Sequence, residues 1–227
     1  MSQFHILFVL SFLLLLPLAT DAHALDFCVI NNASSTKGAH RFMRELGIGY
    51  TKRELIASTS FIWSLFHEHS ASDIKHVKKV TLYIDVFDGL AYTINDEIHI
   101  NADYIATYSG DVKREITGVI VHELAHVWQW FADGQAPGGL IEGIADFVRL
   151  KRGYAPSHWV HRGQGDKWDQ GYDVTARFLD YCNDLKHGFV AKLNKKMKHS
   201  YSDRYFLDLL GKSVDQLWSD YKDIYGK

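Results

Sequence analysis

The sequence has few residues that would interrupt or cross-link a fold. Only three of its 227 residues are proline and two are cysteine, and neither cysteine belongs to a CxxC unit. Without such units, thiolate zinc sites and thioredoxin-like redox chemistry are excluded. Cys28 and Cys182 could form one disulfide bridge in an oxidising compartment, and two free thiols are the alternative. No linker, low-complexity tract or repeat divides the chain, so we expect a single domain and a monomer.

An excess of one charge is also missing. The chain has 25 Lys and Arg residues against 27 Asp and Glu residues, which gives a formal net charge of −2. Binding to nucleic acid depends on clustered Lys and Arg side chains that contact phosphates. The near-neutral balance therefore excludes nucleic acid as the main partner.

A long hydrophobic run occurs only at the start, in residues 6–18 (ILFVLSFLLLLPL), and is followed by an A-x-A-like site ending at Ala24. This layout predicts a signal peptide over residues 1–24 and a secreted mature chain over 25–227. The run is shorter than the ~20 residues of a membrane-spanning helix. The segment before it has no Lys or Arg, so an uncleaved anchor is the alternative. In a secreted chain, the sequon Asn32-Ala33-Ser34 is a candidate glycosylation site. We expect the mature form to have no membrane contact.

The residue pattern places strands in the N-terminal half and helices in the C-terminal half. Alternating apolar and β-branched residues predict strands at 25–31, 79–86, 90–94 and 97–101, the last three as a β-meander. Helical spacing predicts helices at 38–70 (broken around 47–49), 112–131, 140–152 and 173–198, with two short ones at the end. The sequence thus predicts an α+β domain with a small, mainly antiparallel or mixed sheet.

The motif that carries chemistry is His122-Glu123-Leu124-Ala125-His126, within the predicted helix 112–131. Positions i and i+4 of a helix share one face, so both imidazoles can bind one Zn²⁺ ion. Glu123 borders the same site and can act as the general base that takes a proton from water. The alternative is a helix with two buried or paired histidines. Apolar neighbours on both sides of the motif favour the metal site.

A catalytic zinc site needs a third protein ligand. The metzincin spacing HExxHxxGxxH fails here, because Gln129 and Ala132 occupy the places of its glycine and last histidine. Glu142 and Asp146 lie four residues apart on the next predicted helix, after a Gly- and Pro-containing loop that can fold it back. We expect Glu142 to be the third ligand, and Asp146 to accept the free N–H of a histidine ligand. Asp133 and Asp146 are the fallback ligands.

The residues after this helix offer donors that could stabilise an oxyanion. Tyr172 is the first candidate, because it precedes the helix predicted from residue 173, although it could instead pack in the core. His158 and His161 are further candidates, with surface positions as the alternative. One of the strands 90–94 and 97–101 could offer its edge to an extended peptide, if that strand is not interior to the sheet.

Several segments resemble the plant basic secretory protein family, a group of peptidases of plants and bacteria. They are residues 122–150 (HELAHVWQWFADGQAPGGLIEGIADFVRL), 154–160, 165–182, 88–100 and 108–120, and the likeness runs from about Asp26 to Gly226. The resemblance implies a zincin-like fold of the gluzincin type, with zinc on His122, His126 and Glu142 and with Glu123 as base. It also implies an extracellular role in defence, in the apoplast or cell wall.

The chain departs from this family in its charge, because its isoelectric point of about 6.7 is not basic. That departure argues against a role in binding anionic walls or surfaces, and leaves the metal chemistry intact. The sequence predicts a secreted zinc metallopeptidase, specifically an endopeptidase, that acts on peptides or proteins. Two alternatives stay open: a non-catalytic defence or carbohydrate-binding protein that retains a metal site, and a metal-dependent hydrolase of non-peptide amides or esters.

Overall fold

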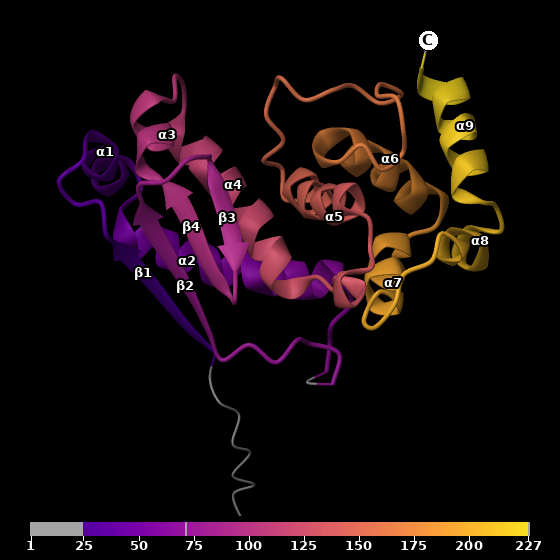
Figure 1. Ribbon diagram of the computed structural model, residues 1–227, viewed down its shortest axis with the longest axis horizontal. Helices are drawn as coiled ribbons and strands as arrows, with labels where there is room; N and C mark the ends of the chain where they lie inside the picture. Colours follow the sequence, from indigo (N-terminus) through magenta and orange to yellow (C-terminus); the bar gives the residue numbers. More distant parts are fainter. Residues whose placement is uncertain (1–24, 71, 227) are drawn as a thin grey trace, which may run out of the picture.

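The structure, a computed structural model, describes residues 25–70 and 72–226, so the predicted signal peptide lies outside the described residues. Four strands and a group of helices follow one another along the chain (Figure 1). The N-terminal half consists of β1 (Asp26–Asn31), α1 (Lys37–Glu45), α2 (Gly47–Leu65), β2 (Lys79–Asp85), β3 (Ala91–Ile94), β4 (Glu97–Asn101) and α3 (Ala102–Thr107). The C-terminal half consists of α4 (Val112–Trp128), the 3-10 turn η1 (Ala132–Gly134), α5 (Gly138–Lys151), α6 (Tyr172–Leu185), α7 (Phe189–Lys196), α8 (Arg204–Leu210) and α9 (Val214–Tyr225).

The predicted α+β class is confirmed, and the sheet is mixed rather than mainly antiparallel. Its strand order is β1-β2-β4-β3, with β1, β2 and β4 parallel and β3 antiparallel to β4. The predicted β-meander is therefore wrong, because β4 lies between β2 and β3. Ile98 and Ile100 of β4 are fully buried, whereas Tyr92 and Ile94 of β3 are exposed. The more apolar strand thus takes the interior place, and the short β3 becomes an edge.

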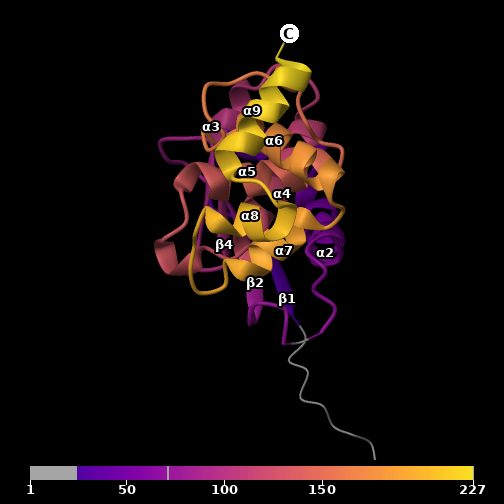
Figure 2. The ribbon, with the colours of Figure 1, turned by 90° about the vertical axis from the view of Figure 1, so that its right-hand side faces the viewer.

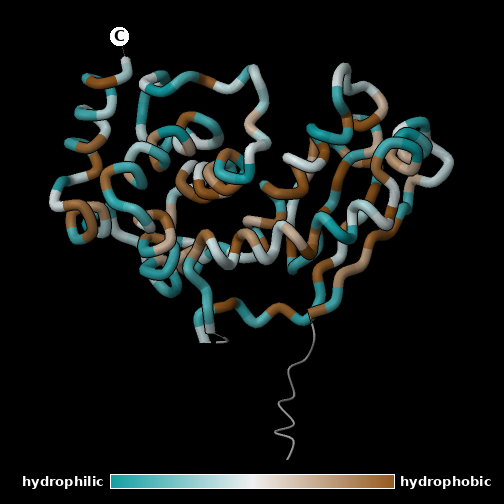
Figure 3. The backbone as a smooth tube through the Cα atoms, turned by 180° about the vertical axis from the view of Figure 1, so that it is seen from behind, coloured by the Kyte–Doolittle hydropathy of each residue, from teal (hydrophilic) through white to brown (hydrophobic). Residues whose placement is uncertain are grey.

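The two faces of the sheet meet different surroundings. Buried apolar side chains of the central strands, such as Leu82 and Ile100, face α2 and α4, and Figure 1 shows α2 running behind the strands. On the opposite face the ring of His99 stacks between those of Tyr83 and Tyr92, with centroids 4.9 and 4.6 Å apart. Hydrophobic stretches follow the strands and the inner sides of helices in Figure 3.

Helices of the second half pack on one another beside the sheet, and Figure 2 shows α6 to α9 on the side that faces the viewer. The predicted helix 173–198 is two helices, because the chain turns at Gly188, whose φ of 76° is left-handed. The predicted break near residue 47 is confirmed, since α1 ends at Glu45 and α2 starts at Gly47 with φ of 73°. Cys28 on β1 and Cys182 on α6 are both free thiols, so the bridge that the sequence left open is not formed.

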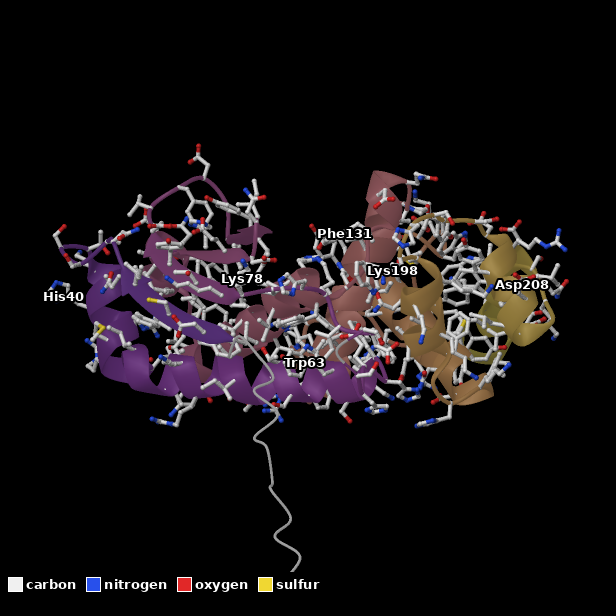
Figure 4. All side chains as sticks on the ribbon, turned by 90° about the horizontal axis from the view of Figure 1, so that it is seen from below. His40, Trp63, Lys78, Phe131, Lys198 and Asp208 are labelled. Carbon is white, nitrogen blue, oxygen red and sulfur yellow. The ribbon has the colours of Figure 1, made fainter. Side chains whose placement is uncertain are left out.

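The helix α4 joins the two halves of the molecule. Its side chains are buried along nearly its whole length, and it lies between the sheet and α5. Trp128 at its end packs edge to face on Trp63 of α2, at 5.0 Å between ring centroids, and Figure 4 shows Trp63 near the middle of the molecule. Within the described ranges, no helix is long and apolar enough to span a bilayer. The chain thus holds α4 rigidly at its centre, where the candidate site lies.

Candidate functional site

The histidines of the motif lie on one face of α4 and approach each other closely. Asp111 is the N-cap of this helix, and its side chain accepts a hydrogen bond from the amide of Arg114 at 2.9 Å. One turn apart, the Nε2 atoms of His122 and His126 are 3.1 Å from each other. Both rings are largely buried, so the helix directs two imidazole nitrogens to one point.

Glu142 reaches this point from α5. Its Oε2 lies 3.2 Å from Nε2 of His122 and 3.6 Å from Nε2 of His126. Close packing of α5 on α6 fixes its position, since a Cβ on Gly143 would lie 2.2 Å from the side chain of Thr175. His122, His126 and Glu142 each offer one ligand atom, and these atoms lie within 4.8 Å of one another. Three donors at this spacing fit a single Zn²⁺ ion, whose bonds to nitrogen and oxygen are about 2.0–2.2 Å long.

Asp146 supports the first of the histidines. Its buried carboxylate lies 2.7 Å from Nδ1 of His122. A carboxylate at this place accepts a hydrogen bond from Nδ1–H, so the ring proton stays on Nδ1 and Nε2 keeps its lone pair for a metal. The other fallback ligand, Asp133, lies away from the cluster, with its exposed carboxylate 4.0 Å from His199.

Gln129 supports the second histidine, and the sequence analysis did not assign it this role. Its side-chain amide lies 2.6 Å from Nδ1 of His126, and its Oε1 is buried without a hydrogen-bond partner in the described part of the chain. The two ends of an amide have nearly the same shape, so their assignment follows from the hydrogen bonds. With Oε1 turned toward Nδ1, the amide oxygen accepts a hydrogen bond from Nδ1–H, which leaves the lone pair of Nε2 free. The buried Oε1 of Gln129, which lacks a partner beside the His126 ring, thus fits a metal bound to Nε2 of that ring.

Replacing Gln129 with leucine is expected to weaken zinc binding by about 10–100-fold, the usual cost of removing a partner of a ligating histidine. Competition with a chromophoric chelator measures this affinity. Gln129→Glu should retain the affinity, because a carboxylate also accepts a hydrogen bond from Nδ1–H. Gln135→Leu, the same change at an exposed position, is the control. An affinity equal to that of the wild type in Gln129→Leu would contradict the role.

The charges around the cluster favour a cation. Burial lowers the pKa of His122, but hydrogen bonds to Asp146 and Glu142 outweigh this effect and raise it to about 10. Burial raises the pKa of Glu142, yet its contacts with His122 and His126 hold it well below the usual range. The site therefore stabilises positive charge at His122 and keeps Glu142 ionised. Both effects suit a divalent metal.

Glu123 lies beside the cluster and contacts β3. Its buried Oε2 accepts a hydrogen bond from Oγ1 of Thr93 at 2.7 Å. No other residue of the described chain donates a hydrogen bond to this carboxylate, so Oε1 of Glu123 can still accept a proton or a hydrogen bond. Glu123 thus lies in the same cavity as the two histidines, on the side of α4 that faces β3.

The site opens into a cavity of about 910 Å³. Its walls include β3, α4, α5, the irregular segment 154–171 and the start of α6. Among the lining residues are Thr93, Glu123, Val119, Trp159, His158 and Tyr172. The ring of Tyr172 lies parallel to that of His122 with centroids 6.3 Å apart, and it is 58% exposed. Its φ of 46° is left-handed, a strained conformation that clusters at functional sites. His161 is not among the lining residues.

Comparison with known proteins relates the chain to peptidases. The family model described as "Peptidase of plants and bacteria" (BSP) matches residues 22–221 of the chain. The chain is also similar to a basic secretory protease of Boswellia serrata, with 50% identity over 60 residues, which cover 26% of this chain and 69% of that protein. No solved structure is significantly similar to it.

Proposed function

This chain belongs to the BSP family, the peptidases of plants and bacteria, and from that premise we propose that it is a secreted zinc-dependent peptidase. The observation that carries the proposal is the convergence of His122, His126 and Glu142 on one point. Zinc, when bound, supplies a Lewis acid and brings the pKa of water to around 7. The rest of the chemistry belongs to side chains of this chain.

Glu123 is the proposed general base. Its Oε2 is held by Thr93, so Oε1 takes the proton from the attacking water and later transfers it to the leaving amine. Tyr172 is the proposed donor to the oxyanion that forms on the peptide carbonyl. Its exposed hydroxyl-bearing ring on the cavity wall, next to His122, supports this role.

The edge strand β3 is the proposed binding place for the substrate. It lines the cavity and pairs with β4 on one side, and no strand of residues 25–70 or 72–226 pairs with its other side. An extended peptide can add to such an edge through main-chain hydrogen bonds. Of the two strands that the sequence offered, β4 is interior and is excluded. The edge strand β3 lies beside α4, which carries the HExxH motif, and the proposed ligand Glu142 is on α5. This arrangement supports a zincin-like fold of the gluzincin type.

We expect the protein to act outside the cell, in the apoplast or cell wall, as a monomeric endopeptidase in defence. The name of the Boswellia serrata relative, basic secretory protease, supports the location. A groove lined by an open strand edge suits internal segments of a polypeptide.

Purified protein of residues 25–227, loaded with zinc, is expected to cleave casein and peptides of a mixed library. Removal of zinc by a chelator should abolish cleavage, because the Lewis acid that lowers the pKa of the attacking water is then missing. Added Zn²⁺ should restore cleavage. Mass spectrometry of the products gives the cleaved bonds. Zinc bound at one ion per chain without cleavage of any peptide would contradict the proposal and favour a non-catalytic binding protein.

A further inference from the structure

Thr93 connects the edge strand to the carboxylate of Glu123. Its Oγ1 is 2.7 Å from Oε2 of Glu123 and 3.0 Å from the backbone carbonyl oxygen of the same residue. Side chains alternate along a strand, so Ala91 and Thr93 face α4 while Tyr92 and Ile94 face solvent. Thr93 is the polar residue of this inner row.

The backbone of Thr93 faces the open edge of the sheet. In antiparallel pairs, residues that exchange hydrogen bonds alternate with residues that do not. Leu90 is one of the residues that exchange hydrogen bonds, since its carbonyl oxygen accepts a hydrogen bond from the amide of Asn101 at 2.9 Å. By the same alternation Tyr92 and Ile94 bond to β4, in register with His99 and Glu97. The N–H and C=O groups of Ala91 and Thr93 therefore point away from β4, toward the cavity side.

From these contacts we propose that Thr93 is a positioning residue that couples peptide binding at β3 to the general base. Its backbone pairs with the extended substrate, and its hydroxyl fixes the carboxylate of Glu123 beside that substrate. The inference rests on the proposed peptidase function and adds the link between substrate strand and base. A base held at a fixed distance from the attacking water needs less reorganisation to take its proton.

The hydroxyl of Thr93 and the backbone edge of β3 are expected to affect different kinetic constants, kcat and KM respectively. Thr93→Val keeps the backbone groups and the β-branched shape but removes the hydroxyl. It should lower kcat by about tenfold, which equals about 1.4 kcal/mol, with KM near that of the wild type. Ala91→Pro removes an outward N–H without breaking the pairing to β4, because proline is tolerated on edges. It should raise KM several-fold and leave kcat nearly unchanged.

The experiment measures kcat and KM per zinc-loaded site for wild type, Thr93→Val, Thr93→Ala, Thr93→Ser and Ala91→Pro. Thr93→Ala should lose kcat like Thr93→Val, and Thr93→Ser should recover it because the hydroxyl returns. Thr107→Val, at an exposed threonine of α3, is the matched control. A structural role alone would change the thermal stability of the variants and leave kcat per site unchanged.

The outcomes separate the inference from the proposed function. An active wild type whose Thr93→Val and Thr93→Ala variants keep full kcat overturns the inference and leaves the peptidase assignment in place. A fall in kcat that Thr93→Ser fails to restore also overturns it. An inactive zinc-loaded wild type overturns both. A loss of kcat in both variants, with recovery by serine and unchanged zinc content, supports the coupling.

Discussion

Replacing Glu123 with glutamine is expected to lower kcat by about a thousandfold while the zinc content stays at that of the wild type. General acid–base groups contribute about 10²–10⁴-fold to rates, and glutamine cannot take a proton from water. The amide oxygen can still accept the hydrogen bond of Thr93, so the side chain should keep its place. Since Glu123 is not one of the three clustered ligands, metal binding should be unaffected.

Peptide cleavage and bound zinc are measured on the same preparation of this variant. Glu97→Gln is the matched control, because Glu97 is a carboxylate of β4 whose Oε1 accepts from the hydroxyl of Tyr83 at 3.1 Å on the solvent face of the sheet. That variant should keep full activity. If Glu123→Gln cleaved peptides as fast as Glu97→Gln, the base would have to be another group.

The second large effect is expected for His122→Ala, which should abolish zinc binding at micromolar metal. His122 contacts the other two ligands and Asp146, so its removal leaves two donors out of three. It also leaves the buried carboxylate of Asp146 without its ring partner, at a cost of about 1–3 kcal/mol in the free energy of unfolding. We therefore expect loss of activity together with a lower melting temperature.

Elemental analysis after gel filtration measures the bound zinc of this variant. His99→Ala is its control, because His99 stacks between two tyrosines on the far face of the sheet. It should bind one zinc ion per chain, as the wild type is expected to do. Full zinc occupancy in His122→Ala would show that the ligands have been wrongly assigned.

The parts of the site that a single helix determines could be predicted from the sequence. His122 and His126 meet because they are four residues apart on one helix, and Glu142 and Asp146 share a face of the next helix for the same reason. The spacing alone could not show that α5 folds back onto α4. That approach depends on small residues such as Gly118 of α4, where a Cβ would lie 2.7 Å from the side chain of Arg149 on α5.

Contacts between distant segments escaped the sequence analysis. Thr93 lies thirty residues before Glu123 and meets it only because β3 takes the edge of the sheet beside α4. Periodicity gave the strands, but their order depends on how deeply each is buried. Gln129 follows His126 by three residues, and its role depends on burial at the end of α4. The division of the predicted helix 173–198 likewise depends on one left-handed glycine, Gly188.

The proposed addition of substrates to the edge of β3 limits the physical state in which a target protein could be cut. Residues that already belong to a helix or sheet have their amide and carbonyl groups engaged, so they cannot pair with a foreign strand until they melt. Hinges, tails and partly denatured chains need little further unfolding before they can pair with β3. Susceptibility to cleavage would then follow the local unfolding free energy of the target more closely than the identity of its side chains.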